Sequence, residues 1–479
     1  MRFLSIFIVL SLGLSLLSCD PTKNKADSST PKQNINDALE EVFERQKLIA
    51  LVDNSTTSYF LYKGQPMGFE YELLSKFTAF LGVDLEIKMI NDLDSVAPTI
   101  NSRNADLIAA NLTVTKERSE LLQFSEPLLC TRQVLVQQLP DNYRTKTWHK
   151  VEKELLRNPI DLAAETVYVK RNSAFYSRLI NLSDEIGEDI VVLQPDSADD
   201  TEALIKLVAE GKIKYTIADE NIAKINLKYY PNLDIKTPIS FNQKIAWATA
   251  KENSDKMLDT LNHWISEITN SQRYAMIQLK YFKARTAHSK KVLSEYSSIG
   301  GNRISSYDEV FKKYAPELGW DWRMLAALCY KESRFDPKAK SWTGAKGLMQ
   351  LIPGTAKEYN LTELTDPEGN VRAGVRYLKW IEGYWKEQIP DSTELQKFVL
   401  ASYNVGLGHI IDAVRLADKY GADPEVWDDN VEEYILKKSQ SEYYNDEVVK
   451  HGYCRGAEPY FYVKEIVSTY RHYLNHIQA

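Results

Sequence analysis

The sequence predicts two domains of different fold class, an α/β domain followed by an all-α domain. Strand-like and helical segments alternate from about residue 41 to 285, which is typical of an α/β fold with a mostly parallel sheet. Over residues 303–479 strand signals are absent, and helix caps and helical periodicity replace them. The chain of 479 residues is also too long for a single core, so more than one domain is expected.

The N-terminal segment, residues 1–18, is predicted to be a lipoprotein signal peptide. One positive charge precedes an apolar run that is too short to span a bilayer comfortably. The run ends in Leu-Leu-Ser-Cys, which resembles the bacterial lipobox and predicts lipidation of Cys19. A plain signal peptide with a chance cysteine is the alternative. Residues 19–40 would then be the lipidated cysteine and a flexible tether, because they are polar and aperiodic.

A lipidated cysteine would place the protein in the periplasm, anchored to a membrane by its acyl chains. We expect the outer membrane. Asp20, which follows the cysteine, favours the inner membrane in enterobacterial sorting and leaves that location open.

The α/β domain, residues 41–285, is predicted from short segments rich in aliphatic residues with helical patterns between them. The predicted strands are Asp84–Ile90, Asp106–Asn111, Arg132–Gln138, Thr166–Lys170, Asp189–Leu193, Tyr215–Ala218 and Lys244–Ala250. Helical periodicity is clear at Glu70–Leu81 and Thr201–Glu210.

The all-α domain, residues 303–479, is predicted from capped, periodic segments. The predicted helices are Trp322–Glu332 capped by Asp321, Val371–Gln388 capped by Asn370, and Pro459–Asn475. Residues 286–302 contain a serine pair and a glycine pair and are predicted to be the linker.

Composition excludes several classes of protein. The net charge of -7 and the pI of about 5.7 argue against a nucleic-acid partner. No spacing of cysteine or histidine suggests a metal site, and no cofactor is expected.

Cys130, Cys329 and Cys454 are expected to be buried free thiols. If the oxidising compartment produces a disulfide, Cys329–Cys454 is the favoured pair.

Residues 41–285 resemble the periplasmic amino-acid-binding proteins. The motifs that carry the resemblance are Gly68–Leu73, Ala105–Arg118, Phe124–Pro127 and Ala218–Glu220. The resemblance implies a bilobal periplasmic-binding-protein-like fold that closes around a small ligand. The ligand stays open between an amino acid, a muropeptide and none.

The resemblance also implies which residues bind that ligand. A guanidinium can grip a carboxylate bidentately, so Arg118 would hold the ligand carboxylate, with Thr113 as a second partner. Asp219 would accept the ammonium group, and Asn172 and Ser173 would offer donors from the second lobe. The alternative for Arg118 is a solvated charge on a helix.

Residues 303–479 resemble the soluble-lytic-transglycosylase family, which has a goose-type lysozyme-like helical fold. Four motifs occur in the family's order: Glu332–Pro337, Gly344–Gln350, Ser402–Gly406 and Glu458–Val463. Ser402 stands where alanine is more usual, and Pro459 where threonine is, which leaves the role of Glu458 uncertain. The resemblance implies peptidoglycan glycan strands as the substrate.

Glu332 is the candidate catalytic acid. It lies at the end of an apolar helical face formed with Leu325, Leu328 and Cys329. Burial there would favour the protonated form that a general acid needs. A glutamate that pairs with an arginine or caps a helix is the alternative that the position alone leaves open.

The sequence places no second carboxylate by motif, although most glycosidases need two. A single acid suits a lyase, in which the C6 hydroxyl of N-acetylmuramic acid attacks C1 and leaves a 1,6-anhydro end. The resemblance gives supporting roles around the glycan and its acetamido group to Ser333, Gly347, Met349, Gln350, Tyr403, Asn404 and Tyr462. Core packing is the alternative for Met349 and Tyr462.

Two other functions stay open at this stage. One is a lysozyme-type muramidase, a hydrolase that leaves a reducing end. The other is a solute-binding or sensor lipoprotein whose helical domain is catalytically inert.

Overall fold

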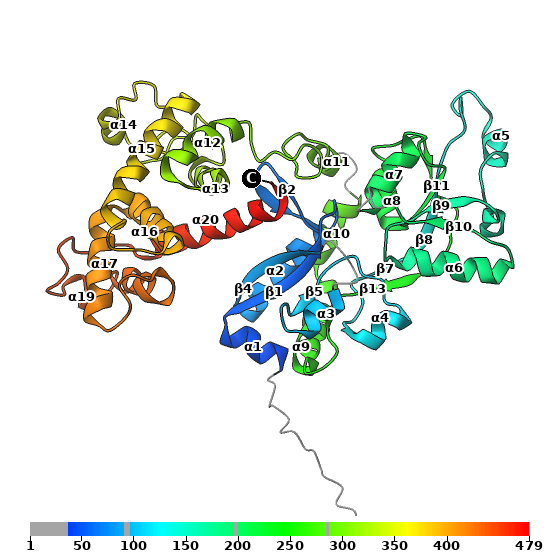
Figure 1. Cartoon of the computed structure of the whole chain (residues 1–479), viewed down its shortest axis with the longest axis horizontal. Coiled ribbons are helices and arrows are strands. Elements are labelled where there is room, and N and C mark those ends of the chain that lie inside the picture. Colours follow the sequence, from blue (N-terminus) through cyan, green and yellow to red (C-terminus); the bar gives the residue numbers. More distant parts are fainter. Residues whose placement is uncertain (1–36, 91–95, 196–199, 284–286, 479) are drawn as a thin grey trace, which may run out of the picture. The chain divides into compact units, whose positions relative to one another are not determined.

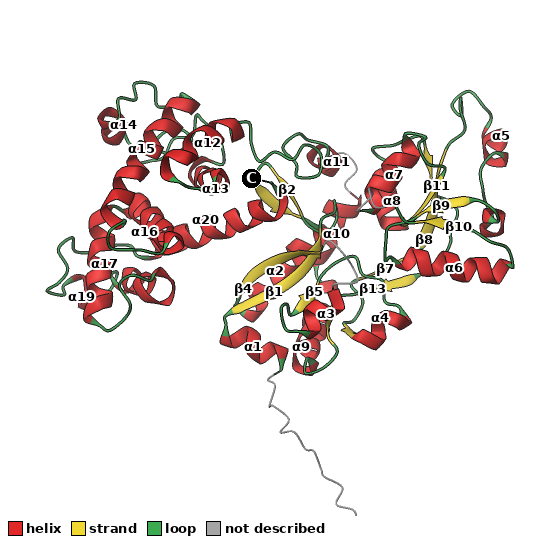
Figure 2. Cartoon of the chain, in the orientation of Figure 1, coloured by secondary structure: helices red, strands yellow, loops and turns green. Residues whose placement is uncertain are grey.

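The computed structural model describes residues 37–90, 96–195, 200–283 and 287–478 (Figure 1). The predicted signal peptide, Cys19 and most of the predicted tether lie outside the described residues. Within the described residues, no helix is both long and apolar enough to cross a membrane. The predicted fold class, an α/β bilobal domain followed by an all-α domain, is confirmed (Figure 2).

The first lobe is built on a five-stranded sheet in the order β4-β1-β5-β14-β6. Its strands are β1 (Lys47–Asp53), β4 (Asp84–Ile90), β5 (Leu107–Ile108), β6 (Leu122–Phe124) and β14 (Ala248–Ala250), with the hairpin β2 (Phe60–Tyr62) and β3 (Gln65–Met67) beside it. Its helices are α1 (Ala38–Glu44), α2 (Phe69–Leu81), α3 (Val96–Asn101), α4 (Lys116–Leu121), α9 (Asp255–Thr269) and α10 (Gln272–Gln278), followed by a short π-helix, Leu279–Lys283. β1 pairs in parallel with β4 and β5, whereas β14 is antiparallel to its neighbours, so the sheet is mixed.

The second lobe has its own five-stranded sheet in the order β10-β9-β11-β8-β12. Its strands are β8 (Gln133–Gln138), β9 (Thr166–Tyr168), β10 (Val191–Leu193), β11 (Tyr215–Asp219) and β12 (Leu233–Asp234). Its helices are α5 (Trp148–Lys153), α6 (Ala174–Ile186), α7 (Thr201–Ala209) and α8 (Glu220–Asn226), with a 3-10 turn at Pro159–Leu162.

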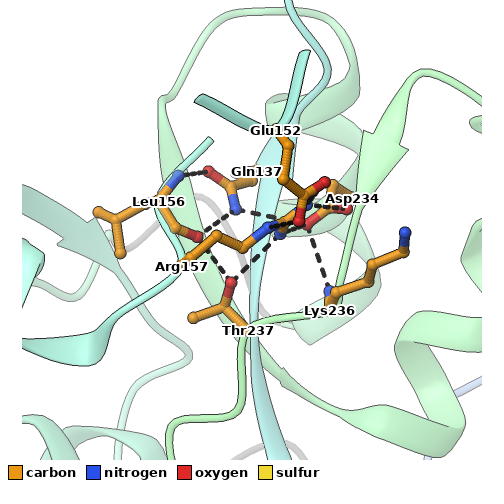
Figure 3. Close-up of polar contacts among 7 residues, drawn as sticks. All are labelled: Gln137, Glu152, Leu156, Arg157, Asp234, Lys236 and Thr237. Carbon is orange, nitrogen blue, oxygen red and sulfur yellow. Dashed lines mark hydrogen bonds and ion pairs between the residues drawn. The ribbon is translucent and has the colours of Figure 1, made fainter. Parts of the chain in front are cut away.

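A partly buried cluster of polar side chains stabilises the edge of the second lobe at β12 (Figure 3). The guanidinium of Arg157 donates to Asp234 of β12 over 3.1 Å and to Glu152 of α5 over 2.6 Å. Gln137 of β8 donates through Nε2 to the carbonyl of Leu156 over 2.9 Å. These bonds connect the irregular segment after α5 to two strands of the sheet, β8 and β12.

The two lobes are joined by a pair of antiparallel strands, β7 (Leu129–Thr131) and β13 (Gln243–Ile245). The chain enters the second lobe through β7 and returns through β13, and Figure 1 shows the two strands together between the lobes. Two adjacent connections of this kind are typical of the hinge of a bilobal clamp.

The C-terminal part is helical. Its helices are α12 (Asp308–Tyr314), α13 (Trp322–Ser333), α14 (Pro353–Glu358), α15 (Pro367–Trp385), α16 (Ser392–Val405), α17 (Leu407–Lys419), α18 (Glu432–Lys437), α19 (Ser441–Tyr444) and α20 (Ala457–His476), with short helical turns at Ala315–Leu318 and Trp427–Val431. Asp321 caps α13 as predicted, accepting from the backbone N–H of Arg323 over 2.8 Å.

Three expectations need correction. α15 begins at Pro367 rather than after Asn370, because Asp366 accepts from the N–H of Gly369 over 2.8 Å and proline fits the first helical position. The predicted linker contains helix α11 (Ala287–Val292). Helix α1 begins three residues inside the predicted tether.

The cysteines of the described residues are all free, so no Cys329–Cys454 disulfide is present. Cys329 and Cys454 are buried as expected, but Cys130 is exposed on β7.

Candidate functional site

Glu332 lies in the last turn of α13, behind a face of fully buried apolar residues that includes Leu325 and Leu328. Burial raises the pKa of its carboxyl from 4.5 to about 7, while a hydrogen bond from Tyr462 and the charge of Lys331 oppose the rise. A carboxyl with this pKa is substantially protonated near neutral pH and can act as a general acid.

Two tyrosines surround the carboxyl. The hydroxyl of Tyr462, on α20, donates to Oε1 of Glu332. The hydroxyl of Tyr403, on α16, donates to the carbonyl of Met349 over 2.7 Å. Burial, and then the nearby carboxylate of Glu332, raise the pKa of both hydroxyls well above 10, so both remain protonated donors. Tyr462 therefore orients Glu332 directly, and Tyr403 connects the site to the neighbouring loop.

A surface pocket of about 390 Å³ opens beside Tyr462. Its lining includes Asn404, Glu458 and Phe461, with Phe461 half exposed. Asn404 is exposed in the pocket, as expected of a residue that contacts substrate. Glu458 is also exposed and lies near Arg455 at 3.7 Å, so it is not held in a desolvated environment like that of Glu332.

The loop that follows α13 is held in place by side chains that the sequence predicts to contact the substrate. Ser333 donates to the carbonyls of Cys329 and Leu348, over 3.1 and 2.9 Å. Gln350 donates through its amide to the carbonyls of Ala339 and Gly347, over 3.1 and 2.9 Å. These side chains fold the loop onto itself and onto the end of α13.

Gly347 and Met349 also face the protein. Gly347 has φ +85°, and a Cβ atom there would lie 2.3 Å from the carbonyl oxygen of Leu364, so close packing within the protein requires the glycine. The side chain of Met349 is completely buried against Gly374 of α15, so it offers no surface to a sugar in this structure. Met349 therefore packs in the protein core, which was the alternative to contact with the sugar.

Asn370 was missed as a site residue because it was taken for a helix cap. It is fully buried inside α15, where Oδ1 accepts from the N–H of Met349 over 2.8 Å. Its Nδ2 donates to the carbonyls of Lys346 and Leu364, over 3.1 and 2.9 Å. No local signal marked it, because its bonds go to backbone groups that are distant in the sequence.

A second candidate site is the cavity between the two lobes, which has a volume of about 90 Å³. A water molecule needs roughly 10–15 Å³ by the same measure, so the cavity has room for a small ligand. The predicted residues Thr113, Arg118, Ser173 and Asp219 line it. Asn172 does not; it lines an adjoining surface pocket that also includes Arg118.

The cavity contains side chains of opposite charge. The guanidinium of Arg118 is held by the carbonyl of Thr113 over 3.0 Å. Asp219 is 4% exposed; its Oδ2 accepts from Asn111 of the opposite lobe over 2.7 Å, and its Oδ1 accepts from none of the described residues. Burial raises the pKa of Asp219 to about 7, so a ligand cation near it would favour its ionised form.

Sequence reasoning missed other cavity residues. Asp53 ends β1, a strand that was not predicted, and Lys170 follows β9. Glu202, on α7 of the second lobe, accepts from the hydroxyl of Thr56 of the first lobe over 2.6 Å, and its burial raises its pKa to about 8. Glu202 therefore links the lobes at the cavity rim.

Two protein families match the chain, one over the part that contains the cavity and one over the part that contains Glu332. The family "Bacterial extracellular solute-binding proteins, family 3" matches residues 47–284, and the "Transglycosylase SLT domain" matches residues 309–425. The protein therefore combines a solute-binding domain with a transglycosylase domain. Tyr462 and Glu458 lie beyond the part that the second family matches.

Curated relatives match nearly the whole chain. The membrane-bound lytic murein transglycosylase F of Desulfosudis oleivorans is 36% identical over 435 residues, which are 90% of this chain and 91% of that protein. The protein of the same name from Photobacterium profundum is 32% identical and covers 93% of this chain and 83% of its own length. The chain belongs to the membrane-bound lytic murein transglycosylase F family.

Solved structures are similar to about half of the chain. A mutant of ArgBP from T. maritima has a TM-score of 0.43 at 22% identity and covers 51% of this chain and 99% of its own. An ancestral arginine-binding protein bound to arginine has a TM-score of 0.42 at 21% identity, covering 50% and 99%.

Proposed function

We propose that the protein is a carbon–oxygen lyase that cleaves the β-1,4 bond between N-acetylmuramic acid and N-acetylglucosamine, with Glu332 as its only catalytic carboxyl. The observation that carries the proposal is a buried carboxyl with a pKa near 7 that is oriented by a tyrosine hydroxyl. Membership of the lytic transglycosylase family supports the substrate class.

One group can serve both steps of the reaction. Protonated Glu332 donates to the glycosidic oxygen as the bond to C1 breaks, and the sugar's N-acetyl carbonyl stabilises the cationic centre. The resulting carboxylate accepts the proton of the C6 hydroxyl as that oxygen attacks C1, which closes the 1,6-anhydro ring and regenerates the acid. Tyr462 stabilises the carboxylate formed between the two steps, because it donates to Oε1.

Digestion of purified sacculi tests this reaction against hydrolysis. Mass spectrometry should show products with anhydro-muramic ends, which are lighter by one water than the products of a muramidase. Reducing muramic ends would instead make the protein a hydrolase, and no digestion would leave a solute-binding lipoprotein with an inert helical domain.

We propose that the cavity between the lobes binds an amino acid or the end of a wall peptide. Arg118 would hold the carboxylate, and Asp219 with its unpartnered Oδ1 would accept the ammonium group. Calorimetry with free amino acids and stem peptides tests this assignment, and absence of binding by all of them would refute it.

We infer that the clamp regulates the enzyme through α20. The hydroxyl oxygen of Tyr59, in the first lobe, lies 2.6 Å from Nδ1 of His472 on α20. The side-chain amide of Asn475, also on α20, donates to the carbonyl of Ile87 over 3.1 Å. The same helix carries Tyr462, which contacts the catalytic acid. Regulation requires that the ligand bind two states of the protein with different affinity. Equal lytic rates of the full chain with and without a bound ligand would exclude it.

We propose that Cys19 anchors the protein to the periplasmic face of a membrane, with the outer membrane as the expected location. The name of the curated relatives includes "membrane-bound", and the lipobox-like sequence supplies a means of attachment. Cys19→Ala should move the protein from the membrane to the soluble fraction, and sucrose-gradient separation of the two membranes would locate the wild type.

A further inference from the structure

An exposed aromatic stripe runs along α15. Tyr377, Trp380 and Tyr384 occur at positions i, i+3 and i+7, so they share one face of the helix. Trp380 is 56% exposed and Tyr384 is 40% exposed, while the other large apolar residues of α15 are buried in the core. Tyr377 is partly buried against the core, so the part of this face that the domain leaves uncovered lies at Trp380 and Tyr384.

The stripe begins at the active site. The ring of Tyr377 lies 5.4 Å from that of Tyr403, the tyrosine beside Glu332. Trp380 is stacked on Tyr377, with ring centres 6.0 Å apart and planes at 13°. One turn earlier on α15, Gly374 packs against Met349 of the loop at the active site. Seven residues of helix span about 10 Å, so the stripe extends the site well beyond the bond that is cleaved.

Flat, exposed rings suit a carbohydrate. The C–H face of a pyranose ring packs on an indole or phenol ring while the sugar hydroxyls remain hydrated, and aromatic rings have rigid geometry with an apolar body. A glycan strand bound for cleavage at Glu332 must continue past the active site on both sides. The stripe offers stacking surface at one of those continuations.

We propose that Tyr377, Trp380 and Tyr384 form an extended binding site for the glycan strand, continuous with the active site at Tyr403. This inference rests on the proposed glycan-cleaving function. Because Trp380 and Tyr384 lie further along α15 than Tyr377, they would act in holding long strands and not in the chemical step.

The test compares Trp380→Ala with Trp148→Ala in the full chain. Trp148 is 50% exposed and lies on α5 of the solute-binding domain, so it controls for the loss of an exposed indole. With long glycan strands, Trp380→Ala should raise KM about 3- to 10-fold, the size expected for one lost aromatic contact. Its kcat, and its kcat/KM on a short tetrasaccharide, should stay at the wild-type values. Trp380→Phe should restore most of the affinity, whereas Trp380→Leu, which is apolar but has no flat ring, should not.

Distinct results would overturn the inference. An unchanged KM for long strands in an active Trp380→Ala variant refutes the stripe and leaves the catalytic proposal intact. Loss of binding to phosphatidylethanolamine–phosphatidylglycerol vesicles with an unchanged KM would make the stripe a membrane contact instead. If the wild-type chain cleaves no glycan, the proposed function and this inference fail together.

Discussion

Glu332→Gln removes the acid while it preserves the packing of the site. The amide has the size of the carboxyl and keeps an oxygen that can accept the hydroxyl of Tyr462. It cannot donate a proton to the glycosidic oxygen or accept one from the C6 hydroxyl. General acid–base catalysis contributes about two to four orders of magnitude, and in the proposed mechanism one group serves both steps, so the rate should fall at least about 100-fold.

The same substitution should stabilise the folded protein at alkaline pH. Burial raises the pKa of Glu332 from 4.5 to about 7, so the folded protein holds this proton more tightly than the unfolded chain does. The contribution of the protonated Glu332 carboxyl to the stability of the folded protein is complete below pH 4.5 and is lost as pH rises through 7. The difference of about 2.5 pH units (7 minus 4.5) corresponds to about 3 kcal/mol above pH 8. The neutral amide avoids that loss.

Two assays together test this reasoning. Anhydro-muropeptide release from sacculi measures the rate, and urea unfolding at pH 4.5 and pH 8.5 measures stability. Glu442→Gln, at an exposed position on α19, is the control and should change neither quantity. Near wild-type product release by Glu332→Gln would refute the catalytic assignment. Equal stability of the variant and the wild type at pH 8.5 would show that Glu332 is not desolvated in solution.

Three further outcomes are expected. Arg118→Ala should weaken ligand binding by roughly 2–5 kcal/mol in calorimetry, because the ligand carboxylate loses its partner, and equal affinity would remove Arg118 from the site. Gly347→Ala should lower the free energy of unfolding by about 1–3 kcal/mol, because Gly347 has a positive φ and lies close to a backbone carbonyl. Gly354→Ala, whose Cβ would meet no atom within 4 Å, is the control and should be tolerated. Equal melting curves for the two variants would contradict this prediction. Burial lowers the pKa of His472 to about 4, below its value in the unfolded chain. The stability of the wild type should therefore fall as pH drops from about 6.5 towards 4, and the stability of His472→Gln should fall less over that range. Equal losses of stability in the two proteins would show that His472 does not titrate in this way.

Local signals predicted those elements whose limits are set locally. Strand β4 has the predicted limits, and α13 begins at its predicted cap, since an alternating pattern and a capping aspartate act within a few residues. Strand β1 was missed although it lies inside the first sheet, where its pairing with β4 and β5 depends on distant residues. The segment Lys244–Ala250 was predicted as one strand, but the chain leaves the hinge strand β13 and joins the sheet of the first lobe as β14.

The residues of the catalytic motifs divide into two groups that sequence alone could not separate. A motif records which residue types occur together, and it does not show whether a side chain faces the substrate or the protein. Glu332 and Tyr462 meet at the site, and Asn404 is exposed beside it. Other members, such as Ser333, are bonded to loop carbonyls. The loop is held from beneath by Asn370, which bonds to three backbone groups and belongs to none of the motifs. Asn370 therefore holds the backbone of Met349, whose carbonyl accepts from Tyr403 beside Glu332, although Asn370 lies outside the recognised motifs.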